Sequence, residues 1–457
     1  DEHAPHAHHR CPLLPHHFEH TTGLASVHAP TNFKAHITLT RSRPGVAWEW
    51  GIRMSVRDWL DERLLMGVKL GLENCATLLS RLGNPHLDFP SIHVAGSNGK
   101  GSACVQLSAA ACANGLTTGL FTSPHLVTVE ERIRIDGRPI SPEAFDRLLG
   151  SVMQAARTEP ECTPTYFETT FLVAMLAFSE AGVERGIIET GMGGRLDATR
   201  LVGADLCILT TVSKEHSEYL GETLVEIAAE KAAIHRPGVP LIALQHDDFH
   251  VRELIERKVG RDLFWLPWPA TGSTWSGHSA VVAAAGSHLG WQASAVDCVW
   301  PGRSPGYGEN WVDGVTTRLS VAHNAESLAN DLAEVTSPSV VLLGMSRKAD
   351  LKATLEPVVS AFSEEGMFPR AVLTEPKSGR NPAVSVNELS EMMRSMGVSQ
   401  STTIERAPER AFEMAGGEAR EIDAELLVIG SVYLVGDLLE YVVERNGLEL
   451  WDELMAH

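Results

Sequence analysis

Short apolar runs alternate with longer segments of helical periodicity through most of the chain. Four early runs are short and bounded by Gly, Pro or polar residues, as buried parallel strands are: SIHVAG, RGIIETG, LCILTTV and PLIALQ. Segments between them, such as FETTFLVAMLAFSEAG, have the spacing of helices. This alternation predicts an α/β sheet with crossover helices from about residue 91 to residue 298.

The same alternation returns after a stretch of different composition. Residues 290–314, GWQASAVDCVWPGRSPGYGENWVDG, are rich in Gly, Pro and Trp and indicate a domain junction. Beyond them, SVVLLG, RAVLTE and LLVIGS predict a second, smaller α/β domain. The sequence therefore predicts domains at residues 54–298 and 312–457, joined by a linker region at 299–311.

The first 53 residues follow neither pattern. The segment DEHAPHAHHRCPLLPHHFEH is rich in His and Pro and has no periodicity. Such tracts can bind metal, but the first methionine is Met54, and amphipathic helical spacing begins directly after it. The segment also lacks the features of a signal peptide. We expect residues 1–53 to be disordered or a non-native extension.

Composition narrows the classes of protein. A chain of 457 residues exceeds one core, and a formal net charge of -20 argues against a nucleic-acid partner. Seven cysteines without a C-x-x-C pair favour a reducing, cytoplasmic location over a disulfide scaffold. No apolar run approaches the roughly 20 residues of a membrane span, so we expect no membrane partner.

A glycine-rich turn, GSNGKGS, follows the first predicted strand. The usual P-loop pattern fails here, because Val94 holds the position of its first glycine and Gly101 separates Lys100 from Ser102. Strand, turn and helix N-terminus still form an anion site of backbone N–H groups. Lys100 would supply a charge and Ser102 a hydroxyl for Mg²⁺, whereas the alternative is a surface turn with an idle lysine.

A carboxylate follows the second of the four early strands. In RGIIETGMGGRLDATR, Glu189 stands where an α/β ATPase holds Mg²⁺. A solvated loop acid is the alternative, and the glycine-rich turn that continues to Asp197 argues against it.

A histidine and a lysine follow the strand LCILTTV. His216 lies just beyond its end, at the edge where α/β ligands bind, although a lone histidine there is more often structural. Thr223 and Glu226 form a T-x-x-E capping box, and Lys231 shares the apolar stripe of the helix that follows. Lys231 should therefore point toward core or cleft with a lowered pKa, unless its head reaches solvent.

Taken in order, these motifs resemble one family. The run G-[ST]-N-G-K-G-S, SPHL, ERI, E-x-G-x-G-G-R-L-D-A-T and E-K-A-x-I is similar to that of the folylpolyglutamate synthase/dihydrofolate synthase family of Mur-type amide ligases, whose P-loop carries the same offset. The resemblance extends from Met54 to the end of the chain. It implies a Mur-ligase-like P-loop ATPase domain with a mostly parallel sheet, a smaller Rossmann-like C-terminal α/β domain, and a monomer.

The resemblance also implies site residues. The ATP site would comprise Gly96, Ser97, Asn98, Gly99, Lys100, Gly101, Ser102, Arg303, Ser320 and Asn324. Two Mg²⁺ ions would be held by Ser102 and Glu189, and by His216 and a carbamylated Lys231. The folate and glutamate sites would comprise Ser123, His125, Glu131, Arg132, Tyr166, Phe167, Glu168, His323 and Ser431. Catalysis would fall to Lys100, His216, Lys231 and His323. For Tyr166 and Ser431, packing in the core is the alternative role.

The chain departs from the family pattern in several places. Ser320 replaces the aspartate of D-[GV]-A-H-N-P, which the family uses to contact nucleotide. Glu215 replaces the usual aspartate before His216, and Glu130 replaces the usual asparagine before ERI. The segment LGMSRKADLKATL usually contains D-K-D in the family, and here only Lys348 and Asp350 correspond to it. The loss at Ser320 puts normal ATP binding in doubt.

The predicted function is an ATP-dependent amide ligase that forms a C–N bond. It would add L-glutamate to dihydropteroate, to the glutamate tail of a reduced folate, or to both, through an acyl phosphate. Three alternatives stay open: a Mur-type ligase with another acceptor, a P-loop switch or motor, and a catalytically silent relative. The folate-side segments argue against the first, and the AHN and GSVYLVG segments argue against the second.

Overall fold

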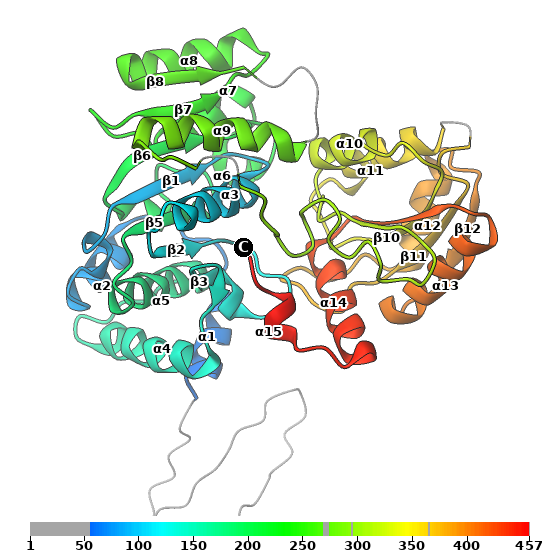
Figure 1. Cartoon of the computed structure of the whole chain (residues 1–457), viewed down its shortest axis with the longest axis horizontal. Helices are drawn as coiled ribbons and strands as arrows, with labels where there is room; N and C mark the ends of the chain where they lie inside the picture. Colours follow the sequence, from blue (N-terminus) through cyan, green and yellow to red (C-terminus); the bar gives the residue numbers. More distant parts are fainter. Residues whose placement is uncertain (1–54, 268–273, 294–295, 364–365, 457) are drawn as a thin grey trace, which may run out of the picture. The chain divides into compact units, whose positions relative to one another are not determined.

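The computed structural model describes residues 55–267, 274–293, 296–363 and 366–456 (Figure 1). The chain divides into units at residues 1–59 and 60–457. The described part of the first unit begins helix α1 (Val56–Asp61), which Ser55 and Asp58 cap by reciprocal hydrogen bonds. The prediction for residues 1–53 lies outside the described residues. Both sheets and the site lie in the second unit.

The larger sheet has eight strands in the order β4-β3-β2-β5-β1-β6-β7-β8. Its pairs are parallel except β2–β3 and β3–β4. The four predicted strands are present, as β1, β5, β6 and β7, and the sequence analysis did not identify β2 and β8. The strands are β1 (Ser91–Ala95), β2 (Thr118–Phe121), β3 (Ile133–Ile135), β4 (Arg138–Pro139), β5 (Arg185–Glu189), β6 (Ala204–Leu209), β7 (Leu241–Leu244) and β8 (Leu263–Leu266).

Helices cover both faces of this sheet. Helices α3 and α9 pack side by side over Ile92 and Val94 (Figure 1). Successive strand residues face opposite ways, so Phe121 points to the other face, where its ring lies 5.8 Å from that of Phe171 on α5. The helices are η1 (Glu62–Met66), α2 (Glu73–Arg81), η2 (Pro85–Leu87), α3 (Lys100–Ala113), η3 (Val129–Arg132), α4 (Pro142–Arg157), α5 (Tyr166–Glu180), η4 (Ala198–Leu201), α6 (Ser217–Leu220), α7 (Leu224–Ala232), α8 (Phe249–Val259), η5 (Gly260–Asp262) and α9 (Thr274–Leu289).

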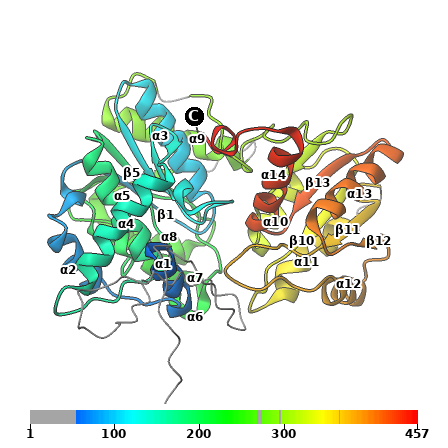
Figure 2. The same ribbon diagram turned by 90° about the horizontal axis from the view of Figure 1, so that it is seen from below.

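The smaller sheet has five parallel strands in the order β12-β11-β10-β13-β9. They are β9 (Thr317–Leu319), β10 (Ser339–Gly344), β11 (Arg370–Thr374), β12 (Ser401–Ile404) and β13 (Glu425–Ile429). Alternation along β10 divides the core, because Val341 and Leu343 face α10–α12 whereas Val340 and Leu342 face α13 and α14 (Figure 2). These helices and the one after them are α10 (Ala325–Ala333), α11 (Leu351–Phe362), α12 (Val386–Ser395), α13 (Pro408–Glu421), α14 (Val432–Asn446) and α15 (Leu450–Glu453).

The predicted fold class, a mostly parallel sheet followed by a smaller doubly covered sheet, is confirmed. The two cores share residues, since Leu126 of the larger half joins the core cluster around α14. The predicted domain boundaries stay predictions, although Trp311 at the end of the predicted linker packs 6.4 Å from Phe412 of the second core. Among the described residues, no helix combines the length and apolarity that a membrane crossing requires.

Candidate active site

A cleft of about 1160 Å³ opens where the carboxyl ends of strands from both sheets meet. Most of the predicted site residues line it: Ser97, Asn98, Gly99, Lys100, Gly101, Ser102, Ser123, His125, Arg132, Tyr166, Phe167, Glu168, Glu189, His216, Arg303, Ser320, His323, Asn324 and Ser431. Gly96, Glu131 and Lys231 lie outside this lining. Parallel α/β sheets bind ligands at this edge.

The turn between β1 and α3 requires glycine at two positions. Gly96 and Gly99 have φ angles of 150° and 79°. A Cβ at Gly96 would lie 1.9 Å from Thr210 Oγ1, and one at Gly99 would lie 1.7 Å from His278 Nε2. The backbone is therefore held against its neighbours, as a cradle for an anion needs.

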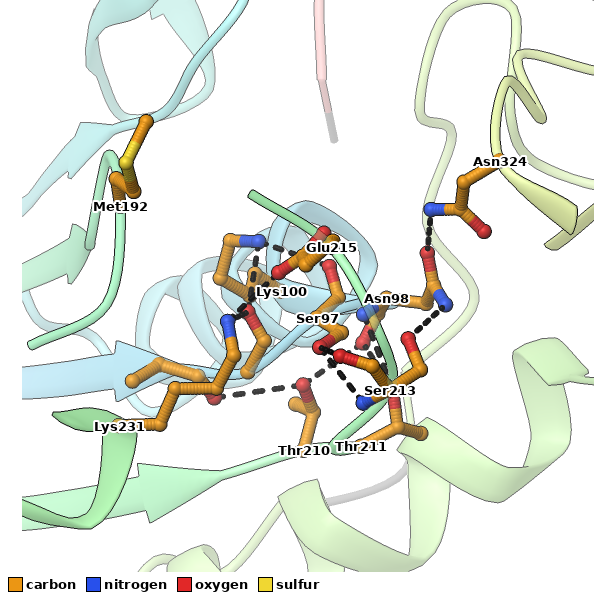
Figure 3. Close-up of polar contacts among 12 residues, drawn as sticks. Ser97, Asn98, Lys100, Met192, Thr210, Thr211, Ser213, Glu215, Lys231 and Asn324 are labelled. Carbon is orange, nitrogen blue, oxygen red and sulfur yellow. Dashed lines mark hydrogen bonds and ion pairs between the residues drawn. The ribbon is translucent and has the colours of Figure 1, made fainter. Parts of the chain in front are cut away.

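Hydrogen bonds fix this turn to the segment after β6 (Figure 3). The Ser97 and Asn98 N–H groups donate to the Thr211 carbonyl and hydroxyl oxygens at 2.7 and 3.0 Å. Thr210 Oγ1 donates to the Asn98 carbonyl at 2.7 Å, and the Ser213 N–H donates to Ser97 Oγ at 2.9 Å. The Ser97 side chain thus stabilises the turn.

Lys100 opens helix α3 and folds back over the turn. Its Nζ donates to the Gly96 and Ser97 carbonyl oxygens, each at 2.9 Å (Figure 3). The N-terminal peptide groups of α3 and the positive end of its dipole lie at the same place. The turn, helix end and ammonium therefore form one site for a multiply charged anion.

Asn98 joins this turn to the second sheet's side of the cleft. Its Nδ2 donates to Glu326 Oε2 at 2.5 Å, and its Oδ1 accepts from Asn324 Nδ2 at 2.8 Å. Asn324 also caps helix α10 by accepting the Ser327 N–H at 2.9 Å. The two halves of the cleft meet at this asparagine pair.

Glu189 lies directly beside the turn, because it is the last residue of β5 and pairs with Val94 of β1. Its side chain is 3% exposed, and one carboxylate oxygen accepts the Ser123 N–H at 2.8 Å. Burial raises the pKa of Glu189, while the cations of Lys100 and Arg303 oppose the rise. A metal ion bound at this position would favour the ionised carboxylate of Glu189, as Lys100 and Arg303 do.

Lys231 points inward, as its helix pattern predicts. Its side chain is 1% exposed, and Nζ donates to Glu215 Oε1 at 2.7 Å and to the Gly96 carbonyl at 2.8 Å (Figure 3). Burial lowers the pKa of Lys231 to about 8, although Glu215 favours the cation. Burial alone would raise the pKa of Glu215, but Lys231 and Lys100 together outweigh it, so the pKa is low. Burial also lowers the pKa of His216.

These donors do not form a closed metal cage. Among the described residues, no three His, Cys, Asp or Glu side chains gather closely enough to hold an ion. Ser102, Glu189 and His216 nevertheless line the same cleft. Magnesium commonly binds through one or two carboxylates together with substrate phosphates and water, so the donor set fits an ion that arrives with a nucleotide.

Helix η3 ends with a stacked cation, Arg132. Arg132 Nε donates to His125 Nδ1 at 3.0 Å, and the Arg132 guanidinium lies 5.2 Å from the centre of the Tyr166 ring. Burial lowers the pKa of His125 to about 3, so its ring is neutral. These three residues form one wall of the cleft.

Two acids predicted to contact substrate are used for local structure. The Glu131 carboxylate lies outside the cleft lining and accepts the N–H groups of Leu126, Val127 and Thr128 at 2.7–3.0 Å. In this structure the Glu131 carboxylate stabilises the loop before η3, and its contact with substrate stays a prediction. Glu168 lines the cleft but accepts the Thr165 N–H at 2.7 Å in a capping box. The T-x-x-E spacing of both acids was the sequence signal for this role.

Ser320 has an acidic neighbour from another element. Its Oγ donates to Asp331 Oδ2 on α10 at 2.6 Å and accepts the Ala322 N–H at 3.1 Å. Asp331 lines the cleft, and burial raises its pKa to about 6. A carboxylate is thus present beside the position where the family pattern has one.

His323 and Ser431 complete the second sheet's side of the cleft. Burial, followed by Lys348, lowers the pKa of His323 to about 4. Its Nδ1 donates to the Val321 carbonyl at 2.9 Å, which leaves Nε2 as an acceptor. Ser431 Oγ accepts the Tyr433 N–H at 3.2 Å and so caps α14.

The sequence analysis missed three residues of the site. His278 on α9 lies against Gly99 and lines the cleft, and Asp331 is paired with Ser320. Trp300 carries the Arg303 guanidinium at 5.4 Å from its ring centre. Hydrophobic periodicity marks none of them as functional, because His278 and Asp331 act through neighbours distant in sequence or on another element, and Trp300 has the pattern of a buried core residue.

Known proteins with this sequence pattern and fold share one family. No model of a known protein family matches the chain. A segment of 190 residues is 40% identical to the dihydrofolate synthase/folylpolyglutamate synthase of Bacillus subtilis, covering 41% of this chain and 44% of that protein. The chain thus matches less than half the length of this curated relative.

Solved structures match over a longer range. Escherichia coli FolC in complex with DHPP and ADP superposes with a TM-score of 0.73 at 23% identity, covering 86% of this chain and 99% of that one. The Yersinia pestis bifunctional folylpolyglutamate synthase/dihydrofolate synthase with Mn, AMPPNP and L-glutamate bound has a TM-score of 0.66 at 25% identity, covering 87% and 99%.

The two sheets, with the glycine turn at their shared cleft, have the two-domain α/β fold of these solved structures. The matched segment of this chain is similar in sequence to the dihydrofolate synthase/folylpolyglutamate synthase of Bacillus subtilis, and its fold is similar to the solved structures named above.

Proposed function

We propose that the protein is an ATP-dependent ligase that joins L-glutamate to dihydropteroate, to the glutamate tail of a reduced folate, or to both. One observation carries the proposal: the glycine turn, Lys100, Glu189, Arg303 and His323 line a single cleft between the two sheets. The names of the relatives and the ligands of their structures support the same activity.

The nucleotide phosphates would lie on the turn at residues 96–102. Lys100 Nζ would exchange its two carbonyl acceptors for phosphate oxygens, and the guanidinium of Arg303, which lies beside Gly101, would supply a second cation. Preorganised donors of this kind stabilise the charge that develops during phosphoryl transfer. His323 and Asn324 would complete the site from the second sheet's side.

The coupling would proceed in two steps. The acceptor carboxylate attacks the γ-phosphorus of ATP and gives an acyl phosphate, with ADP as the leaving group. The α-amine of glutamate then attacks the acyl carbon, phosphate leaves, and an amide forms. A free carboxylate is a poor acylating agent, so ATP consumption drives the reaction, and a closed cleft protects the acyl phosphate from water.

We further propose two magnesium positions, one at Ser102 and Glu189 and one at His216 and Lys231. Bound Mg²⁺ would neutralise phosphate charge. A carbamate on Lys231 requires the neutral amine, and the lowered pKa of about 8 supports a substantial neutral fraction near pH 7.5. In the structure this lysine instead pairs with Glu215.

The acid beside Ser320 belongs to the same proposal. We propose that Asp331 supplies the carboxylate that other family members carry on the strand end, and that the Ser320 hydroxyl orients it. The 2.6 Å bond between them supports this role. The replacement at Ser320 would then preserve ATP binding.

A substrate panel tests the proposal. Purified protein is incubated with MgATP and glutamate, with either dihydropteroate or tetrahydrofolate, and products are identified by mass spectrometry. We expect a product one glutamate heavier, with ADP release that requires both glutamate and acceptor. The absence of product with every acceptor, from folded protein, would support a silent relative instead.

A further inference from the structure

Two arginines share one indole ring next to the cleft. The guanidinium carbons of Arg134 and Arg303 lie 4.9 and 5.4 Å from the centre of the Trp300 ring. Trp300 is 5% exposed and belongs to the core cluster under α3. An arginine on an aromatic face keeps its N–H edge available to an anion.

Arg303 is thereby directed at the glycine turn. A Cβ at Gly101 would lie 3.1 Å from Arg303 Nη1 and 3.5 Å from the Trp300 ring. Burial lowers the pKa of Arg303, and the charge of Glu189 opposes this shift. Because Gly101 has no side chain, the Arg303 guanidinium lies close to the turn while it rests on the Trp300 ring.

Arg134 is the second arginine on the Trp300 ring. Its side chain is 1% exposed, and it donates to the carbonyl oxygens of Glu131 and, at 3.2 Å, Leu454. The Glu131 carboxylate lies 3.9 Å away and offsets the charge of the buried guanidinium. Arg134 is thus fixed at several points and does not face the cleft.

The segment Leu454–Ala456 belongs to both halves of the protein. Leu454 packs in the core around α14, whereas Ala456 packs in the same cluster as Trp300. The Ala456 N–H donates to the Gly137 carbonyl at 2.9 Å. Just before it, the Glu453 carbonyl accepts from Tyr307 Oη at 3.1 Å. This segment therefore ties α14 to the strands that carry Arg134.

We propose that Trp300 and Arg134 are positioning residues for Arg303, and that the segment Leu454–Ala456 holds them in place, so that nucleotide affinity depends on the last described residues of the chain. The inference rests on the proposed function in one respect, namely that Arg303 binds nucleotide phosphate. A long side chain already ordered on a ring loses less conformational entropy when the ligand binds.

Direct MgATP binding, measured by calorimetry on the full chain, tests the inference. Trp300→Leu and Arg134→Met should each raise the Kd for MgATP about fivefold, the size of one cation–π contact. Ending the chain after Glu453 should have a similar effect. Trp300→Phe, which keeps an aromatic face, should retain most of the affinity. The KM for glutamate should not change.

A double-mutant cycle separates positioning from general packing. In an Arg303→Ala background, where affinity is already low, adding Trp300→Leu should change the Kd less than twofold. Trp291→Leu is the matched control, because Trp291 packs against the same core cluster, whereas Arg134 and Arg303 lie on the Trp300 ring. Thermal melts identify variants that are merely unstable.

The outcomes distinguish the two proposals. Wild-type protein that binds no MgATP would refute the proposed function before any variant is made. Normal binding by Arg303→Ala would remove Arg303 from the nucleotide site. If Arg303→Ala weakens binding but Trp300→Leu and Arg134→Met do not, or if their effects simply add to it, the positioning role is wrong.

Discussion

The two walls of the cleft hold their polar groups in different ways. On the larger sheet's side, the backbone groups of Ser97 and Asn98 form hydrogen bonds with residues 210–211, and glycine is required at two positions where a Cβ would lie less than 2 Å from a neighbouring side chain. On the smaller sheet's side, side chains hold one another, as Ser320 and Asp331 do. Where the backbone is packed this closely, few substitutions are tolerated. Where side chains hold one another, a carboxylate can be supplied from a different element.

Lys100→Ala, on the larger sheet's side of the cleft, should have the largest effect on product formation. It removes the only lysine at the N-terminus of α3, whose ammonium lies over the turn. We expect product formation to fall at least a thousandfold, as losses of central phosphate-binding charges do, with an unchanged circular dichroism spectrum.

The matched control is Lys258→Ala, an exposed lysine in the last turn of α8. Its activity should equal that of the wild type. Substantial turnover by Lys100→Ala would show that the turn does not bind the transferring phosphate.

Lys231→Ala, on the same side of the cleft, should have the next largest effect on turnover. It leaves the Glu215 carboxylate without its 2.7 Å partner and removes the amine proposed to carry the carbamate. We expect turnover to become undetectable while the fold persists. Lys231→Met, which keeps most of the side-chain volume, should be equally inactive.

A readout other than turnover tests the carbamate itself. Protein equilibrated with ¹³C-bicarbonate should show a bound carbamate signal by NMR, absent in Lys231→Ala. Wild-type rates in Lys231→Ala would refute the role of this residue, whereas an inactive variant with no carbamate signal in the wild type would assign Lys231 to the ion pair with Glu215 instead.

An exchange of side chains tests the smaller sheet's wall. Asp331→Ser removes the carboxylate, and Ser320→Asp alone brings two carboxylates together where a 2.6 Å bond now lies. Each single change should raise the Kd for MgATP about thirtyfold, the scale of a hydrogen bond to a charged group. The double variant Ser320→Asp/Asp331→Ser should recover to within about threefold of the wild type.

Binding by the double variant that is as weak as the two single effects combined would contradict the interchange. It would mean that Asp331 has a structural role and that the family position is not restored by moving the acid back.

The same contrast explains what the sequence could predict. Strands such as β1 and β10, and the capping box at Thr223, follow from local periodicity and spacing, and the structure confirms them. The inward direction of Lys231 followed in the same way. Such features depend on neighbours within one or two turns.

Features that depend on distant neighbours were not predictable. Asp331 lies eleven residues after Ser320 on another element, and nothing in either segment announces their pairing. Glu131 and Glu168 show the opposite case, because their T-x-x-E spacing predicts the capping boxes that the structure contains, while the substrate contacts that the family motifs imply stay predictions. Resemblance identifies which motifs occur together, but the hydrogen bonds of each acid decide its role.

The smallest predicted effect concerns stability and pH. Burial raises the pKa of Asp331 from its ordinary value of 3.8 to about 6, so the folded state binds its proton more tightly than the unfolded state. The stability that this group contributes is therefore present below pH 4 and is lost as the pH rises through 6. Asp331→Asn should make the ligand-free protein about 1 kcal/mol more stable than wild type at pH 7, because an amide needs no desolvated charge.

Urea denaturation at pH 4 and pH 7 measures this difference. The advantage of Asp331→Asn should disappear at pH 4, where the wild-type carboxyl is neutral in the folded protein, while MgATP affinity at pH 7 should be lower in the variant. A stability gap that is the same at both pH values would show that Asp331 is ionised at little cost in the fold. In that case the wall of the smaller sheet would resemble the other wall more closely, with its acid held by fixed donors rather than by a single serine.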